Sequence, residues 1–448
     1  MKRLLFIPFL LVFVLAFCLE EASGSGPKVR ILLSESGQPV TVSSTGGLVV
    51  GRPGGAFPVT GNTALTILPS GNQLLWKEKN ITATGFIIKP AGRDYLFVGQ
   101  RAYRGHLVLL PGPGIIRTIN VLELDDYISG TMKLETNPTW PEDALKAQII
   151  ASRTFALRNL ERNSDNEYDF CATPLSQAYG GINAEDPRTN RLIDETRNLI
   201  LTYQDEPANA VFHSQSGGVT EDARHVWGTS VPYLISVPSP WESDAPHSSW
   251  KIRISADSLS TTLEHAGLTQ GKIQTIQPVY SENGGRVKEL VILTDYDTYR
   301  ISSQRFRQAV GFEVLPSTFF KLEMLSLSET VQREVFRERP LSSEEAFDLA
   351  SYLERDLTLD DIIDIIERRQ RERERKRSDT WRDIPLERTL EWVDIQRPKE
   401  FVLVGRGFGH GVGLSQWGSR GMALEGYNYK DILLHYFPGT EIRRAHFR

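Results

Sequence analysis

The sequence predicts an α+β protein that is rich in β-structure. Three observations support this prediction: short apolar runs separated by Gly and Pro across residues 28–114, one long helical pattern over residues 141–161, and a dense run of charges within residues 329–398. Short strands with turn residues between them are typical of sheets, whereas a 3.6-residue apolar period is typical of a helix. With 448 residues, the chain is long enough for two or three domains.

The composition excludes several classes of protein. Hydrophobic residues make up 40% and charged residues 24%, which is ordinary for a globular chain and excludes a wholly disordered or collagen-like one. A net charge of −5 gives no general attraction to a phosphate backbone, so we expect no nucleic-acid partner. The two cysteines, Cys18 and Cys171, are too few for a disulfide framework.

Residues 1–25 are predicted to be a signal peptide or an N-terminal anchor. Lys2 and Arg3 precede an apolar run over residues 4–17, and acidic and small residues follow it. Because a spanning helix needs about 20 apolar residues, a cleaved export signal is the leading interpretation. An uncleaved anchor and lipid modification at Cys18 are the alternatives, although the large Phe17 disfavours the latter. We expect an exported protein of the periplasm or cell envelope, which contacts the membrane only through this segment and only if the segment is not cleaved.

Residues 28–114 are predicted to form an N-terminal β-rich region. Gly and Pro cluster at residues 52–55 and 111–114, where they favour turns. The expected strands are Val29–Leu33, Leu48–Val50, Ala64–Leu68, Gly85–Lys89 and His106–Leu110.

Residues 141–161 carry the strongest helical pattern of the chain. Pro141 suits a first helical turn, and Glu142 and Asp143 complement the positive end of the helix dipole. A second helix is predicted at about 186–198. Apolar runs at 199–203 and 210–213 then predict two strands around a turn.

Residues 329–398 are predicted to be a charged helical insertion. Ser342 and Glu345 have the spacing of a capping box, and acidic and basic residues alternate through residues 367–377. Mixed charge at this density favours a solvated helix over a nucleic-acid or membrane surface.

Glu135 is the first candidate for chemistry. It lies before a Pro-Thr-Trp-Pro turn that opens the long helix, beside Leu134 and Trp140. A partly desolvated carboxyl has a raised pKa and suits an acid. The alternative is a solvated surface glutamate in a loop.

The second candidate segment is residues 212–222, where a Ser-rich Gly-Gly turn follows a strand. Such a turn either presents hydroxyls and amides to a ligand or is an ordinary polar turn. A serine hydrolase is disfavoured, because the adjacent His213 and Ser214 point to opposite faces of a strand and no Gly-x-Ser-x-Gly elbow is present.

The third segment is the Gly-rich run over residues 405–418, which lacks the Gly-Lys-Ser/Thr of a phosphate-binding loop. His410 lies between two glycines and either handles a ligand or proton or simply stabilises a turn. His213, His225, His410 and Cys171 form no pair with zinc-ligand spacing. We therefore expect no metal and no cofactor.

Together, these segments resemble the SpoIID family, also called the SpoIID/LytB or amidase-enhancer domain, over residues 115–320 and 401–442. The pieces that carry the resemblance occur in family order: residues 127–130, Glu135 with Trp140-Pro141, residues 144–156, 177–181, 212–218, 302–307, 317–319, 405–416 and 435–440.

The resemblance implies a SpoIID-type catalytic domain over residues 115–328 and 399–448. It implies an exported lytic transglycosylase that cleaves between N-acetylmuramic acid and N-acetylglucosamine in peptidoglycan glycan strands denuded of stem peptides, leaving 1,6-anhydro ends. The alternative it implies is a non-catalytic protein that binds peptidoglycan and enhances a cell-wall amidase partner.

The resemblance also assigns residues. Glu135 aligns with the catalytic glutamate and Arg153 with an arginine required for activity, which either binds the lactyl carboxylate or steadies Glu135. Leu175 and Ser176 replace the His-Cys pair of the family members that bind zinc, which agrees with no metal here. The motif residues expected to bind substrate are Gln177, Tyr179, His213, Ser214, Ser216, His410, Ser415 and Gln416.

Overall fold

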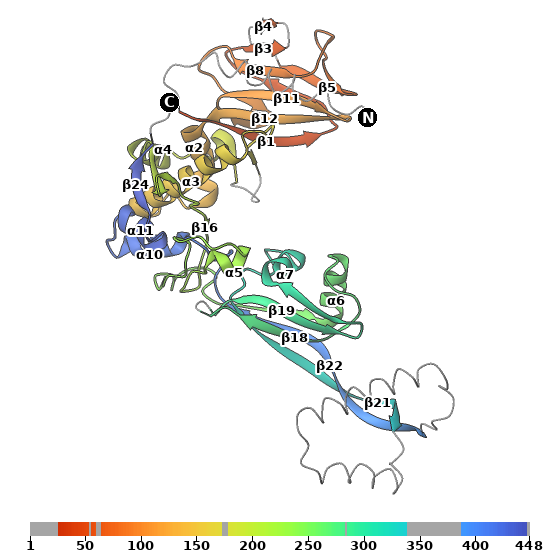
Figure 1. The fold of residues 1–448 in the computed structure, drawn as a ribbon. Coiled ribbons are helices and arrows are strands. Elements are labelled where there is room, and N and C mark those ends of the chain that lie inside the picture. Colours follow the sequence, from red (N-terminus) through yellow and green to blue (C-terminus); the bar gives the residue numbers. More distant parts are fainter. Residues whose placement is uncertain are drawn as a thin grey trace, which may run out of the picture. The chain divides into compact units, whose positions relative to one another are not determined.

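The computed structural model describes residues 26–52, 55–59, 64–172, 178–282, 285–337 and 387–445. Strands outnumber helices in the described residues, and the predicted α+β, β-rich class is confirmed (Figure 1). Residues 324–401 form one compact unit, and the remaining residues form another. The predicted signal or anchor at residues 1–25 lies outside the described residues. In the described part of the chain, no helix combines the length and the apolar character needed to cross a bilayer.

Two antiparallel-rich sheets form the N-terminal region, as the Gly- and Pro-punctuated apolar runs predict. The first sheet has the order β13-β1-β12-β11-β8-β3-β4 and the second the order β10-β9-β2-β5-β6-β7. The strands of the first sheet are β1 (Lys28–Ser36), β3 (Leu48–Arg52), β4 (Gly55–Val59), β8 (Phe86–Pro90), β11 (His106–Gly112), β12 (Ile115–Glu123) and β13 (Phe170–Cys171). Those of the second are β2 (Val40–Ser43), β5 (Leu65–Ser70), β6 (Gln73–Trp76), β7 (Ile81–Ala83), β9 (Leu96–Val98) and β10 (Arg101–Tyr103).

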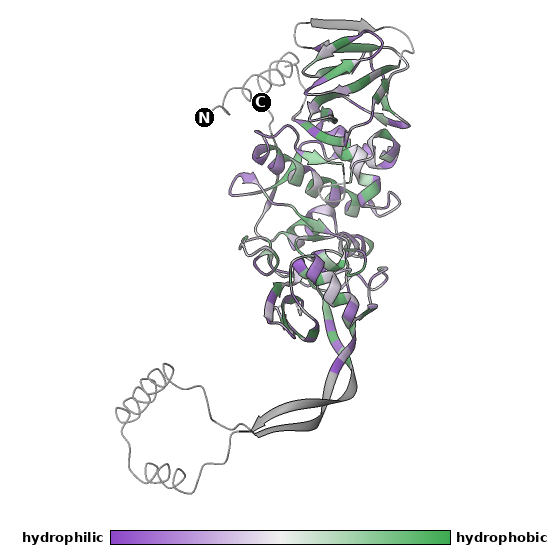
Figure 2. Cartoon of the chain, turned by 90° about the vertical axis from the view of Figure 1, so that its right-hand side faces the viewer, coloured by the Kyte–Doolittle hydropathy of each residue, from purple (hydrophilic) through white to green (hydrophobic). Residues whose placement is uncertain are grey.

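The two sheets share one hydrophobic core. Side chains from both, such as Val42, Leu65, Ile88 and Leu109, are buried against one another. The alternate residues of the first sheet, Val108 among them, pack into a separate cluster on its other face. Successive residues of a strand point to opposite faces. Because both faces of the first sheet pack into hydrophobic clusters, its strands are largely hydrophobic in Figure 2.

Three helices follow the N-terminal sheets and carry the candidate site. They are α2 (Leu124–Glu135), α3 (Glu142–Arg162) and α4 (Pro187–Glu195), with the short η1 (Gly181–Ala184) before α4. The predicted helices at 141–161 and 186–198 are confirmed as α3 and α4. One face of α3 packs with α2 and α4, and another packs with β14, α10 and α11. The long helix therefore joins two cores.

Short strands bring distant parts of the sequence together below α3. Strand β14 (Leu199–Tyr203) lies between β15 (Glu206–Pro207) and β24 (Glu441–Arg444). Strand β16 (Phe212–His213) pairs in parallel with β23 (Leu414–Ser415). The Ser-rich segment and the Gly-rich segment, about 200 residues apart, are thus neighbours.

The other elements of the described residues are α5 (Ala223–Trp227), β17 (Trp250–Ser255), α6 (Ala256–His265), β18 (Ile273–Tyr280), β19 (Val287–Thr294), β20 (Thr298–Ser302), α7 (Ser303–Val310), α10 (Gln416–Leu424) and α11 (Tyr429–Tyr436). Strands β18, β19 and β20 form an antiparallel sheet. Helix α11 begins with a capping box between Asn428 and Asp431.

The predicted helical insertion differs from the structure at both of its ends. Residues 329–337 lie in β21 (Phe320–Arg337) and residues 387–398 in β22 (Glu387–Gly405), which are neighbouring strands of one sheet. Phe320, Leu322 and Met324 recur every two residues, so the segment begins with a strand pattern. Residues 338–386, which include the charged run, lie outside the described residues.

Candidate active-site cleft

A cleft of ≈430 Å³ contains Glu135 and joins all three of the polar segments that the sequence singles out. The first segment supplies the end of α2 and the loop after it, the second supplies Ser214, and the third supplies the start of α10. The lining residues are Lys133, Leu134, Glu135, Thr136, Asn137, Pro138, Trp140, Ser214, Gln416 and Trp417. Glu135 and the end of the Gly-rich segment therefore line one cleft.

Glu135 is the last residue of α2 and is half-buried. Its Oε1 accepts a hydrogen bond from the Ala178 N–H at 3.1 Å. Burial raises the pKa of Glu135, and hydrogen bonds from the Ala178 amide and the Gln416 side chain lower it by less. Glu135 therefore keeps its proton to a higher pH than a solvated glutamate, which is what a general acid needs.

Helix α2 positions Glu135, and sequence reasoning missed this helix. Leu124, Tyr127, Ile128 and Met132 are buried along one face of it. Its N-terminus has no side-chain cap, and its middle contains Ser, Gly and Thr, which favour helices weakly. The apolar period was the available signal. The helix ends because Thr136 is extended, with φ −140° and ψ 160°.

Two tryptophans form one wall of the cleft. The Trp140 and Trp417 rings meet edge to face with centroids 5.2 Å apart. The guanidinium of Arg420 lies 5.1 Å from the Trp417 ring centre, and its Nη1 pairs with Asp244 at 2.6 Å. Trp417 is therefore held from both sides, and its ring can serve as a fixed apolar surface for a sugar.

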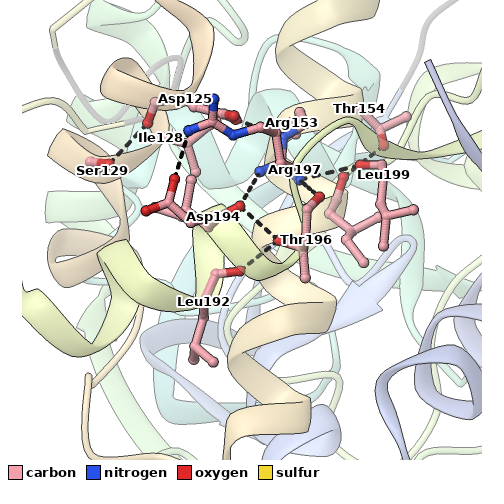
Figure 3. Close-up of polar contacts among 12 residues, drawn as sticks. Asp125, Ile128, Ser129, Arg153, Thr154, Leu192, Asp194, Thr196, Arg197 and Leu199 are labelled. Atoms are coloured by element: carbon pink, nitrogen blue, oxygen red, sulfur yellow. Dashed lines mark hydrogen bonds and ion pairs between the residues drawn. The ribbon is translucent and has the colours of Figure 1, made fainter. Parts of the chain in front are cut away.

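The structure corrects the expectation that Arg153 binds substrate or steadies Glu135. Arg153 is 0% exposed, and Figure 3 shows its side chain directed at the loop that follows α4. The Nε donates to Asp125 Oδ1 at 2.8 Å. The remaining bonds go to backbone carbonyls, those of Thr196 at 2.9 Å, Leu199 at 3.3 Å and Ile193 at 3.2 Å. Arg153 thus ties α3 to the C-terminal end of α4, because the last carbonyls of a helix need donors.

Tyr179, expected to bind substrate, belongs to the core instead. It is 4% exposed, and its hydroxyl donates to Asn120 Oδ1 at 2.8 Å. Its ring packs on those of Tyr103 and Tyr127, and Gly130 leaves the room that the ring needs. The neighbouring candidate Gln177 lies outside the described residues.

Ser216 and Ser415 are also withdrawn from the expected substrate-binding set, because both are bound to the buried carboxylate of Glu242. The Oε1 of Glu242 accepts from the hydroxyls of Ser216 at 2.7 Å, Ser239 at 2.8 Å and Ser415 at 2.5 Å. Backbone amides add two more bonds, Ser216 N to Oε1 and Gly217 N to Oε2. We call Glu242 with these three serines the carboxylate hub. No motif singled out Glu242, since Ser216 and Ser415 are distant from it in the sequence.

His213 and His410 lie beside each other, with ring centroids 5.5 Å apart, and neither lines the cleft. The Nδ1 of His213 donates to the Val412 carbonyl at 3.0 Å. His410 donates from Nε2 to the Phe212 carbonyl and accepts the Val412 N–H at Nδ1, both at 3.0 Å. Both nitrogens of His410 thus form hydrogen bonds within the fold. This agrees with the alternative in which His410 stabilises a turn.

Burial keeps both histidines neutral. It lowers the pKa of His213 to about 3, with Arg286 adding to the effect, and it lowers the pKa of His410 well below the usual value, with His213 adding to the effect. Neither histidine lines the cleft or carries a charge, and the expected substrate-binding role of both stays a prediction. Ser214 and Gln416 are the candidates that do face the cleft.

The glycines of the third segment are required by close packing. Gly411 has φ +85°, and a Cβ there would lie 2.5 Å from the Arg286 guanidinium carbon. Gly413 has φ +71°, and a Cβ there would lie 2.3 Å from the Val211 carbonyl oxygen. Both positions therefore require glycine. We attribute the repeated glycines to close packing around β16 and not to the approach of a ligand.

Among the described residues, no group of three or more His, Cys, Asp or Glu side chains is arranged to hold a metal ion. Cys171 is a free thiol at the edge of the first sheet.

Comparison with known proteins supports the resemblance found in the sequence. Residues 114–203 match the family model SpoIID, described as stage II sporulation protein. An uncharacterized protein of Brachyspira hyodysenteriae is 25% identical over 76% of this chain and 72% of its own length. The stage II sporulation protein D of Bacillus subtilis is 26% identical over 82% of this chain and 86% of its own length.

The amidase enhancer of Bacillus subtilis is 25% identical over 70% of this chain, and the match covers 40% of that longer protein. The matched segment 114–203 contains Glu135, α2 and α3. The chain therefore carries a SpoIID domain at residues 114–203 and is related to the SpoIID family.

Proposed function

We propose that this chain acts on the bacterial cell wall as an exported lytic transglycosylase, with Glu135 as both acid and base. The substrate is the glycan strand of peptidoglycan, cut between N-acetylmuramic acid and N-acetylglucosamine. The observation that carries the proposal is a lone half-buried carboxyl with a raised pKa in a cleft walled by two tryptophans. The relatives named stage II sporulation protein D and amidase enhancer support a cell-wall role.

The lone carboxyl favours this reaction over hydrolysis. Hydrolytic glycosidases use two carboxylates, one as acid and one to activate water or attack carbon. Glu135 is the only carboxylate among the cleft residues. In a lytic transglycosylase the 6-hydroxyl of the muramic acid replaces water, so a second carboxylate is not needed, and the intramolecular attack is favoured by proximity.

The proposed steps balance without a co-reactant. Protonated Glu135 gives its proton to the glycosidic oxygen as the bond from that oxygen to C1 breaks. The 6-hydroxyl oxygen then bonds to C1, and its proton returns to the Glu135 carboxylate. The products are a 1,6-anhydro end and a new hydroxyl end, and the enzyme is restored.

Mass spectrometry of digested peptidoglycan tests this proposal. The native protein should produce 1,6-anhydromuramic ends from amidase-stripped sacculi, and Glu135→Gln should lower their rate of formation by about 100-fold or more. Glu264→Gln is the matched control, since Glu264 is exposed on α6 and outside the cleft. Reducing ends in place of anhydro ends would contradict the proposal.

The second candidate function is a non-catalytic enhancer of a cell-wall amidase, favoured by the match to the amidase enhancer over 70% of this chain. It predicts that native protein and Glu135→Gln bind glycan and stimulate an amidase equally, without anhydro ends. The same digests, repeated with an added amidase, separate the two functions.

A further inference from the structure

Arg153 is buried away from the cleft, so the positive charge in the cleft comes from another residue. Lys133 is the only Lys, Arg or His among the lining residues. It lies on the last turn of α2, two residues before Glu135, and is exposed. Within the described residues, its ammonium group has no hydrogen bond or ion pair. A charge that the fold itself does not use is therefore presented beside the candidate acid.

We propose, on the basis of the proposed function, that Lys133 is a specificity-determining residue that pairs with a free carboxylate of the bound glycan. In muramic acid that carboxylate is the lactyl group. When a stem peptide is attached, the carboxylate becomes an amide and loses its charge. Lys133 would thus favour strands without stem peptides through charge.

The other polar lining groups discriminate less. Asn137, Ser214 and Gln416 are neutral and can hydrogen-bond an amide as well as a carboxylate, so they favour the carboxylate less than a full positive charge does. The tryptophan wall contacts the apolar face of a sugar irrespective of the lactyl group. An ammonium group on a flexible stem suits a carboxylate whose position varies, because it acts as a point charge.

Calorimetric binding to two matched glycans tests the assignment. The full chain with Glu135→Gln, which leaves the glycan intact, is titrated with a peptide-free oligosaccharide and with the same oligosaccharide whose lactyl carboxylates are capped as methylamides. We expect the free carboxylates to bind about three- to fivefold more tightly at low salt, the range of a solvent-exposed pair. Adding Lys133→Met should abolish this preference and leave the affinity for the capped glycan unchanged.

Two variants control the measurement. Lys133→Arg should keep most of the preference, because the charge remains. Lys251→Met removes an exposed lysine of β17 outside the cleft and should change neither affinity. Equal binding of both glycans by the Glu135→Gln protein, or an equal loss of both on Lys133→Met, would overturn the proposal.

The outcome is separable from that of the proposed function. A preference that depends on Lys133, without anhydro ends from the native protein, would support the carboxylate contact and reject the transglycosylase. Anhydro ends without a preference would do the reverse.

Discussion

At the scale of single residues, Glu135 and Arg153 differ in the surroundings that the fold gives them. Both lie in the segment matched by the family model, 18 residues apart. Glu135 faces the cleft with a raised pKa, whereas Arg153 is wholly enclosed by carbonyls and Asp125. The contacts of Arg153 therefore hold the fold around α3 and α4 together.

Gln416→Leu should move the alkaline limb of the activity profile, where the rate falls as the pH rises, to higher pH. The Gln416 side chain lowers the pKa of Glu135, so its loss raises that pKa further. A general acid works while protonated, and its rate falls as the pH rises through its pKa. The pH profile of anhydro-end formation checks this, with the exposed Gln270→Leu as control. An unshifted limb, or one at lower pH, would reject the argument.

Glu135→Gln should also raise the thermal stability at neutral pH. A carboxyl whose folded-state pKa is raised destabilises the fold above its unfolded pKa, because the folded state resists ionisation. The amide carries no charge and still accepts the Ala178 N–H. The difference in Tm between variant and native protein should shrink as the pH falls towards 4, and Glu264→Gln should show no such trend.

At the scale of elements, the contact between α3 and α4 depends on Arg153. Its guanidinium is shared among the carbonyls of Ile193 and Thr196 at the end of α4, the carbonyl of Leu199 at the start of β14, and the carboxylate on α2 (Figure 3). A buried donor that serves several acceptors stabilises a fold mainly through what its loss leaves unpaired.

Arg153→Met should lower the free energy of unfolding by about 3–5 kcal/mol, since methionine fills the space but removes the buried charge-assisted hydrogen bonds that Arg153 donates. Urea denaturation measures the change. Arg191→Met removes an exposed ion-paired arginine of α4 and should cost at most about 1 kcal/mol. Equal losses for the two variants would contradict the structural role.

The predictability of each element depended on how local its signals are. The N-terminal strands and α3 were predicted because alternation, turn residues and helix-start residues lie within the segment itself. Helix α2 was missed because it lacks a side-chain cap. Glu242, Trp417 and the enclosed state of Arg153 depend on partners far away in the sequence, so no local pattern indicates them.

At the scale of the whole molecule, the chain separates into a unit of residues 324–401 and a unit that holds the complete cleft. Since β21 and β22 are neighbouring strands, the chain leaves the cleft-bearing unit and returns to it through two adjacent strands. The described side chains of the two cores around α3 all belong to the unit that holds the cleft.

Replacing residues 338–386 with a short Gly-Ser linker should therefore leave the cleft-bearing unit folded. We expect a Tm within about 2 °C of the native value, the range of changes that disturb no core contact. Calorimetry and anhydro-end formation check this, with a second linker of scrambled sequence as control. An insoluble variant would show that the replaced residues are needed for folding.

The carboxylate hub determines when during folding the cleft can be completed. The hub cannot form before Ser415 reaches Glu242. The cleft cannot form before Gln416 and Trp417, about 280 residues after Glu135 in the sequence, reach that residue. Contacts of such long sequence separation form late, because the intervening loop must close first. A chain whose residues 414–417 have not yet been synthesised therefore has Glu135 but no complete cleft around it.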